Sequence, residues 1–324
     1  MTSAVTKRRL GNTDIEITPI GVGTMQLSGG GLVGLAYPAV DEDVSTGVIR
    51  AAVAGGINWF DTAEMYGHGR SESALANGLR AAGVKPGEVV VATKWAPFGR
   101  TAGNIGRTIH RRRSALAEYP IDLHQIHMPF GSLSSIPAQV RAMAELVQAG
   151  KIRSVGVSNF SATQMEKAAA TLAPYGIRLA ANQVQISALH RKIDTNGVLA
   201  TARRLGVTLI AYSPLASGIL TGRFHDDPAA YAALPRGRRL ALGRNPIDRT
   251  APVIDELRRV AASHDVAIPQ VALAWLTTFY GETVVAIPGA SKPRQAEQSA
   301  AAMDIRLSAT ELARIDEASR RSSR

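Results

Sequence analysis

The feature that most constrains the fold is a repeated alternation of short apolar segments with longer segments of helical periodicity. Strand-like segments occupy 20–24, 57–61, 89–94, 123–127, 154–158, 180–184, 208–212 and 284–287, and helix-like segments follow at 44–54, 71–81, 105–116, 136–148, 163–172, 198–205, 253–263 with 269–278, and 293–301. Eight such units predict an α/β fold of the (β/α)8 barrel type. Barrels of this length are routinely one domain, so we expect residues 1–324 to form a single domain.

Two additions flank these units. Gly11-Asn12 separates the β-like residues 8–10 and 15–17, which predicts a small N-terminal hairpin. At the other end, Ser308 and Glu311 have the spacing of a capping box, so residues 308–320 are expected to form an extra C-terminal helix.

The chain of 324 residues carries a formal net charge of +11, which raises the question of nucleic acid. Basic residues cluster at 107–113, on a segment that we interpret as a solvent-exposed helix face, and at Arg236, Arg238, Arg239, Arg244 and Arg249. Neither cluster accompanies a nucleic-acid motif, and aromatic residues are only 5 % of the chain, too few for a stacking platform. We therefore expect no nucleic-acid partner; the positive charge suits a phosphate-bearing cofactor instead.

The sequence contains no cysteine, which excludes disulfides and thiolate metal sites, and no other metal-ligand pattern predicts a metal ion. The charged N-terminal residues are not followed by the apolar segment of a secretion signal, and charge, glycine or proline interrupts every long apolar run. We expect a cytoplasmic protein without a membrane span. The oligomeric state is left open.

Ionisable side chains lie at the ends of three consecutive strand-like segments. Asp61 ends the segment 57–61, Lys94 ends 89–94 and His127 ends 123–127, while Tyr66 follows shortly after Asp61. Parallel strands of a barrel bring their carboxyl ends to one face, where barrel enzymes place their active sites. We therefore expect these four side chains to converge.

The four side chains together suit general acid catalysis. A free phenol has a pKa of about 10, and lowering it by three units requires about 4 kcal/mol of stabilisation of the phenolate. Lys94 in a dry cleft would supply much of this, and Asp61 would keep the lysine charged and oriented. Taken singly, Asp61 and Lys94 could be a structural ion pair, Tyr66 a rim aromatic and His127 a core histidine. The combination favours Tyr66 as a general acid with a lowered pKa.

The chain resembles the aldo-keto reductases in seven segments, spread over most of its length in the order of that family. These are residues 56–67 (GINWFDTAEMYG), Thr93-Lys94, 122–127, 155–160 (VGVSNF), 182–184 (NQV), 211–215 (AYSPL) and 287–291 (IPGAS). The resemblance implies a barrel plugged at its bottom by the hairpin and NADPH-dependent reduction of a small aldehyde or ketone. It also implies that Tyr66 protonates the substrate oxygen, that Lys94 and Asp61 tune it, and that His127 orients the carbonyl.

No Gly-x-Gly-x-x-Gly stands between a strand and a helix, so a Rossmann site is disfavoured and side chains would bind the cofactor. Ser158, Asn159 and Gln183 suit a carboxamide, and Tyr212 offers a flat face to a pyridine ring. Taken alone, Asn159 could cap a turn and Gln183 could bond buried backbone. The resemblance adds Gly23, Thr24, Ser213, Pro214, Leu215, Ser217, Gly218, Ile287, Gly289, Ser291, Lys292, Arg294, Gln295, Gln298 and Ser299.

In this resemblance Lys292 and Arg294 would bind the 2′-phosphate of NADPH. Gln295 stands where the family often has a basic residue, and Ser299 where it has an asparagine. NADPH is the predicted cofactor, with NADH possible.

The segments around the expected substrate pocket depart from the family. Met25 replaces a common tryptophan, and Met128-Pro129-Phe130 replaces a common Arg-Pro-Asp triplet. An apolar pocket mouth is expected above Tyr66, lined by Met25, Trp95, Phe98, Met128 and Phe130.

Two other functions stay open. Lys94 could form a Schiff base in a barrel lyase, although a neighbouring Asp61 would hold the lysine protonated. Some aldo-keto reductase relatives are cofactor-sensing subunits of membrane proteins, so a binding module with little turnover is the second alternative.

Overall fold

The computed structural model describes residues 6–28, 40–235, 239, 242 and 246–322. Arg236, Arg238 and Arg244, which the sequence placed in a basic cluster, lie outside the described residues.

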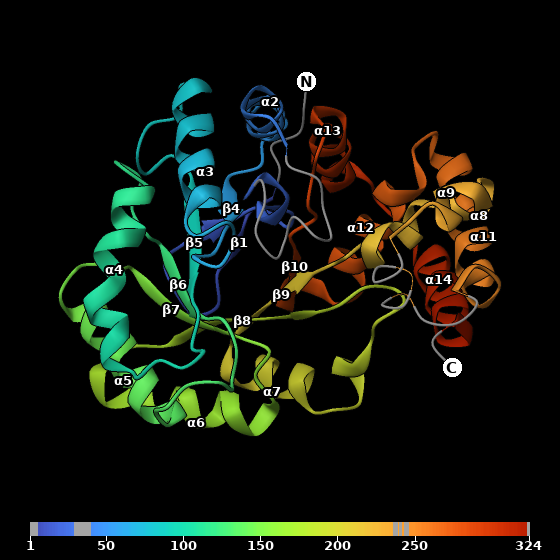
Figure 1. Cartoon of the computed structure of the whole chain (residues 1–324). Helices are drawn as coiled ribbons and strands as arrows, with labels where there is room; N and C mark the ends of the chain where they lie inside the picture. Colours follow the sequence, from blue (N-terminus) through green and yellow to red (C-terminus); the bar gives the residue numbers. More distant parts are fainter. Residues whose placement is uncertain (1–5, 29–39, 236–238, 240–241, 243–245, 323–324) are drawn as a thin grey trace.

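The sheet that forms the centre of the molecule consists of eight parallel strands in the order β3 to β10 (Figure 1). They are β3 (Val22–Gly23), β4 (Trp59–Asp61), β5 (Val90–Trp95), β6 (Leu123–Ile126), β7 (Ser154–Ser158), β8 (Leu179–Gln185), β9 (Thr208–Tyr212) and β10 (Val284–Ala286). Parallel bridges between Ile20 and Ala286 and between Gly23 and Gly289 join the first and last strands. The predicted (β/α)8 barrel is thereby confirmed.

Helices lie outside the strands and cover them (Figure 1). Following the strands in order, they are α2 (Glu42–Ala54), α3 (Arg70–Ala81), α4 (Gly103–Ala115), α5 (Ile136–Gln148), α6 (Ala162–Leu172), α7 (Val198–Leu205), α12 (Ile268–Phe279) and α13 (Pro293–Ala301). α13 packs against α2, so the helical ring closes where the strands close.

The predicted hairpin is present as β1 (Arg8–Arg9) paired antiparallel with β2 (Glu16–Ile17). Its apolar residues Leu10, Ile15 and Ile17 are buried in the same cluster as the inward side chains of the strands, which closes the bottom of the barrel. Gly11, at φ +58°, lies so close to the Ala180 carbonyl that a Cβ there would stand 2.4 Å from its oxygen. Only glycine fits this contact.

Extra helices stand to one side of the barrel, at the right of Figure 1: α8 (Arg223–Asp226), α9 (Pro228–Ala232), α11 (Pro246–His264) and α14 (Ala309–Ser322). Short 3-10 turns occur at Met25–Ser28, Ala173–Tyr175, Lys192–Asp194, Ala216–Thr221, Gly281–Thr283 and Ala302–Asp304. The predicted capping box of α14 is present, because the Ser308 hydroxyl accepts from the Glu311 amide at 3.3 Å and the Glu311 carboxylate accepts from the Ser308 amide at 2.8 Å.

Helix α11 begins earlier than the sequence predicted, at Pro246, and includes Pro252. In this first turn Pro246 and Thr250 are buried, and the Thr250 hydroxyl donates to the Pro246 carbonyl at 2.5 Å. Pro252 has no backbone N–H to donate within the helix.

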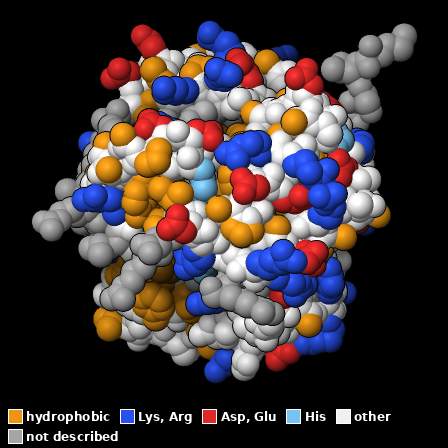
Figure 2. Space-filling model, turned by 90° about the vertical axis from the view of Figure 1, so that its right-hand side faces the viewer, with side chains coloured by type: hydrophobic (Ala, Val, Ile, Leu, Met, Phe, Trp, Pro, Cys, Tyr) orange, Lys and Arg blue, Asp and Glu red, His pale blue; other side chains and the backbone are white. Residues whose placement is uncertain are grey.

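Basic and acidic side chains are interspersed on the face that carries α11 and α14 (Figure 2). Arg258 contacts Asp226 at 2.8 Å, and both Arg259 and Arg314 contact Glu256, at 2.5 and 3.2 Å. Among the helices that the structure describes, none is long and apolar enough to cross a membrane.

Candidate active site

Polar side chains continue the inward-facing rows of the barrel above its apolar layer. Along each strand every second side chain points inward, and the inward apolar residues Trp59, Ala92, Leu123 and Ala181 belong to one buried cluster. Two positions further along, the same rows carry Asp61, Lys94, Gln125 and Gln183. The carboxyl ends of four strands therefore direct polar groups to one place.

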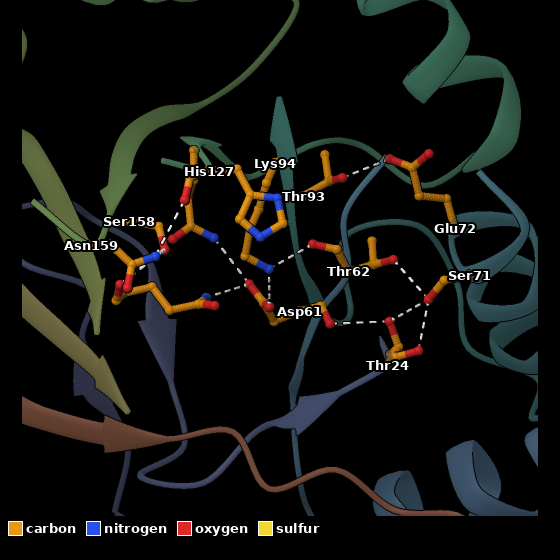
Figure 3. Close-up of polar contacts among 12 residues, drawn as sticks. Thr24, Asp61, Thr62, Ser71, Glu72, Thr93, Lys94, His127, Ser158 and Asn159 are labelled. Carbon is orange, nitrogen blue, oxygen red and sulfur yellow. Dashed lines mark hydrogen bonds and ion pairs between the residues drawn. The ribbon is translucent and has the colours of Figure 1, made fainter. Parts of the chain in front are cut away.

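Asp61 and Lys94, which we call the floor pair, form a buried ion pair at the centre of this layer (Figure 3). The Lys94 ammonium is 0 % exposed and also donates to the Thr62 carbonyl at 2.9 Å. The second carboxylate oxygen of Asp61 accepts from Gln125 at 3.0 Å and from Gln183 at 2.9 Å. Both charges are thus hydrogen-bonded, as buried charges must be.

The floor pair lies beneath Tyr66, with the Lys94 nitrogen 5.2 Å from the centre of the phenol ring. Burial alone would lower the pKa of Lys94, but Asp61 and the Tyr66 oxygen together raise it above its ordinary value. Burial raises the pKa of Tyr66 and outweighs the lowering by Lys94. The predicted lowering of the Tyr66 pKa is therefore wrong for this cleft, because desolvation of the phenolate is the larger effect. Tyr66 holds its proton.

His127 packs edge-on against Tyr66, with ring centres 5.8 Å apart and planes at 82°. Burial, and secondarily the Lys94 charge, lowers the pKa of His127 to about 3, so the imidazole is neutral near pH 7. Its Nδ1 atom is buried and has no hydrogen-bond partner among the described residues. A neutral imidazole in this place can donate or accept one hydrogen bond without adding charge.

Asn159 links the next two strands of the site. Its backbone is left-handed, at φ 62°, and its amide nitrogen donates to the Ser158 hydroxyl at 3.0 Å and to the His127 carbonyl at 3.4 Å. The Tyr212 hydroxyl donates to its oxygen at 3.0 Å. A strained backbone held by side-chain bonds is typical of ligand-binding positions.

A cleft of about 1210 Å³ opens above these groups. Most of the residues singled out in the sequence border it: Gly23, Met25, Asp61, Tyr66, Phe98, His127, Met128, Ser158, Asn159, Gln183, Tyr212, Ser213, Pro214, Leu215, Ser217, Gly218, Ile287, Gly289, Ser291 and Gln295. Left-handed backbone recurs at Ser213 and Ser217, which border the cleft, and at Ala216 between them.

Four predicted residues near the floor and the mouth lie elsewhere. Lys94 is beneath the cleft, and the buried Thr24 hydroxyl bonds Ser71 at 2.8 Å. Trp95, expected at the mouth, is 1 % exposed and belongs to the barrel wall, because its indole points outward and donates to Asn104 at 3.0 Å. Phe130 is exposed and packs on Phe98 without bordering the cleft.

Of the residues predicted to bind the adenosine, some border the cleft and others lie outside it. Ser291 and Gln295 border the cleft and bond each other, the Ser291 amide donating to the Gln295 side-chain oxygen at 2.8 Å. Lys292 and Arg294 are exposed at the start of α13 and, with Gln298, do not border the cleft. The Ser299 hydroxyl is buried and donates to its own helix, at the Gln295 carbonyl.

Sequence reasoning missed a second buried charge cluster beside the floor pair. Glu64 accepts from Arg100 at 2.6 Å and pairs with Arg112, whose Nε donates to Glu72 at 2.8 Å. Thr93, next to Lys94, donates to Glu72 at 2.6 Å (Figure 3). We call Glu64, Glu72, Arg100 and Arg112 the rim cluster.

The rim cluster corrects the interpretation of residues 107–113 as a wholly solvent-exposed helix face, because Arg112 is only 8 % exposed. Sequence reasoning also missed Gln125, although its signal was present: Leu123, Gln125 and His127 alternate in phase along one strand-like segment. Thr221 and Arg223 border the cleft as well and were not singled out. Among the residues that the structure describes, no group of three or more His, Asp or Glu side chains could hold a metal ion.

Known proteins resemble the chain over nearly its whole length. The profile of the Aldo/keto reductase family matches residues 19–320. An uncharacterized oxidoreductase of Mycobacterium tuberculosis is 36 % identical, covering 94 % of this chain and 90 % of that protein. The NADH-specific methylglyoxal reductase of Escherichia coli is 29 % identical, with 92 % and 94 % covered. The solved structure of a glycerol dehydrogenase from Gluconobacter oxydans superposes with a TM-score of 0.82 at 27 % identity, with 98 % and 95 % covered. With its barrel and these matches, the chain belongs to the aldo/keto reductase family and is an NAD(P)H-dependent oxidoreductase.

Proposed function

We propose that the protein reduces an aldehyde or ketone to an alcohol with NADPH, and that Tyr66 donates the proton. The observation that carries the proposal is the floor pair beneath Tyr66. It places a lysine that is protonated near pH 7 below a phenol at the base of an open cleft. A general acid needs a proton to donate and a charge that stabilises the anion left behind, and this arrangement provides both.

The residues around the cleft fit a nicotinamide cofactor. Ser158, Asn159 and Gln183 present hydroxyl and amide groups beside Tyr66, and Tyr212 supplies the flat side of an aromatic ring. Ser213 and Ser217, both with left-handed backbone, lie along one wall of the cleft, and the side chains that border the cleft continue to Ser291. These residues would hold the nicotinamide, the diphosphate and the adenosine in that order.

When bound, the reduced nicotinamide supplies a hydride to the carbonyl carbon. The Tyr66 hydroxyl gives its proton to the carbonyl oxygen, and Lys94 stabilises the phenolate that remains. Asp61 keeps Lys94 charged and fixed. His127, neutral, orients the carbonyl by a hydrogen bond. Alcohol oxidation would use the same groups in reverse.

NADPH is proposed over NADH because Lys292 and Arg294 lie at the start of α13, whose first turn has no side-chain cap. Two basic side chains beside the N-terminus of a helix suit a 2′-phosphate. The methylglyoxal reductase of Escherichia coli is described as NADH-specific, so NADH is the alternative. We expect a higher kcat/KM with NADPH; a higher value with NADH would overturn this preference.

Replacement of the Tyr66 hydroxyl tests the function. On a panel of aldehydes and ketones, followed by consumption of NADPH or NADH, Tyr66→Phe is expected to lower kcat by about 10²- to 10⁴-fold while calorimetry shows unchanged cofactor affinity. Tyr175→Phe, away from the cleft, is the matched control and should match the wild type.

The results also separate the alternatives. Equal turnover by wild type and Tyr66→Phe would contradict the role of Tyr66. Cofactor binding without turnover on the whole panel would favour a cofactor-sensing module. Trapping of a substrate on Lys94 by borohydride would favour a Schiff-base lyase, which the raised pKa of Lys94 argues against.

A further inference from the structure

Arginines gather at one side of the cleft, away from the wall assigned to the cofactor. Arg100, Arg111 and Arg112 all border the cleft. Arg112 is buried between Glu64 and Glu72, whereas the Arg100 side chain is 39 % exposed. Arg100 and Arg112 pair with the two glutamates of the rim cluster, and the exposed Arg111 adds a further positive charge at the cleft. Asp41 also borders the cleft but precedes α2, in a different strand-helix unit.

Arg100 is held in place at both its backbone and its side chain. Its carbonyl accepts from the Leu133 amide and from the Ser132 hydroxyl, each at 2.9 Å. One terminal nitrogen, Nη1, donates to Glu64 at 2.6 Å and to the Ala96 carbonyl at 3.4 Å. Glu64 is itself fixed, because its carboxylate also accepts from the Ala96 amide at 2.6 Å and pairs with Arg112.

The other edge of the Arg100 guanidinium is available to a ligand. Its Nε and Nη2 atoms have no hydrogen-bond partner among the described residues, and a guanidinium edge matches the two oxygens of a carboxylate. An arginine that is already ordered loses little side-chain entropy when it binds. Glu64 thus orients the guanidinium of Arg100 through Nη1 and leaves the edge formed by Nε and Nη2 open to a ligand.

The surface beside Arg100 is apolar. Phe98 is 44 % exposed and Met65 is 40 % exposed, and both border the cleft together with Met25 and Met128. Phe98 is braced by Phe130 at 6.0 Å between ring centres. Thioether and aromatic side chains form an adaptable apolar wall. The wall is suited to the apolar body of a ligand and Arg100 to a charged group at its end.

We propose that Arg100 is a specificity-determining residue that binds a carboxylate of the substrate, so that the preferred substrates are apolar aldehydes or ketones bearing a carboxylate. The proposal rests on the proposed function, because it names the substrate class of the same cleft. It assigns the rim cluster a role in recognition, separate from proton donation by Tyr66.

The test compares terephthalaldehydic acid with its methyl ester, which share the aromatic aldehyde and differ in one negative charge. Wild type should prefer the acid by about tenfold or more in kcat/KM, and Arg100→Leu should abolish this preference mainly through the KM of the acid. Arg100→Lys, which keeps the charge without the fork, should retain part of it. Arg107→Leu, an exposed arginine of the neighbouring α4 that does not border the cleft, should behave as wild type.

An acid-to-ester ratio that is unchanged in Arg100→Leu and Arg100→Lys would overturn the proposal and leave carbonyl reduction intact. If neither aldehyde turns over, calorimetric binding of the acid to the protein with NADP decides. Binding that weakens at least tenfold in Arg100→Leu supports the anion site even though the proposed reduction fails, and no detectable binding to wild type overturns it. Thermal unfolding shows which variants are folded.

Discussion

The floor pair and the rim cluster are both buried groups of opposite charges, yet they meet the cleft differently. Lys94 has no exposed surface and lies under the ring of Tyr66. In the rim cluster, Glu72 and Arg112 are buried in the same way, but Arg100 extends to the surface of the cleft. Burial of an ion pair alone therefore does not identify a reacting group. What distinguishes the two is which side chain each one supports: a phenol in one, a guanidinium fork in the other.

The largest difference between the two regions is expected from Lys94→Met. Loss of the charge beneath Tyr66 should lower kcat by about 10³-fold. Because Asp61 loses its buried cation, the free energy of unfolding should also fall by about 3–5 kcal/mol. Initial rates, corrected for the folded fraction from denaturant titration, measure the first effect, and the titration itself measures the second. Lys151→Met, at an exposed position, is the control.

A folded Lys94→Met variant with a kcat near that of the wild type would contradict this prediction. The floor pair would then contribute to stability only and would have no role in catalysis.

Glu64→Gln, unlike Lys94→Met, should lower the stability of the protein and leave its catalytic rate nearly unchanged. It weakens the bonds to Arg100 and Arg112, so the free energy of unfolding should fall by about 1–3 kcal/mol. The kcat for an uncharged aldehyde should stay within about threefold, since the carboxylate of Glu64 bonds Ala96, Arg100 and Arg112, none of which donates a proton in the reaction. Thermal unfolding and steady-state rates check both values. A loss of kcat as large as that of Lys94→Met in a folded protein would merge the two regions into one catalytic unit.

The pH profile should be the smallest effect. The His127 pKa of about 3 lies far below neutrality, and the pKa of Tyr66 is raised above its ordinary value. Tyr66 therefore keeps its proton and His127 stays neutral, so kcat for reduction should be level between about pH 6 and 9 and fall only at alkaline pH. Alcohol oxidation, which needs the deprotonated phenol, should rise with pH. An inflection near pH 6.5 that disappears in His127→Gln would contradict this assignment.

Much of the floor could be predicted because it depends on regular strands. Asp61, Lys94 and Gln183 lie at strand ends, and parallel register brings strand ends together whatever the loops do. Gln125 could have been predicted in the same way, because it lies between Leu123 and His127 in the set of alternating residues that point into the barrel. The sign of the Tyr66 pKa shift could not be predicted, since it depends on how far the phenol is desolvated.

The rim cluster could not be predicted from the chain alone. Glu64 and Arg112 are 48 residues apart, and their contact depends on which face of α4 turns toward the barrel. Helical periodicity gave no reason to separate Arg112 from the exposed arginines beside it. The prediction that Trp95 lines the cleft was wrong for a related reason. Successive side chains of a strand point to opposite faces, so a shift of one residue decides whether the last side chain points into the barrel or, as for Trp95, outward.

The central claim is that Lys94 acts on the reaction through Tyr66. The most direct test is the kcat of the double variant Tyr66→Phe/Lys94→Met beside the two single variants and the wild type. If Lys94 serves only to support the phenol, the double variant should be about as slow as the slower single variant. Losses that multiply in the double variant would show that Lys94 contributes independently of Tyr66 and would contradict the account.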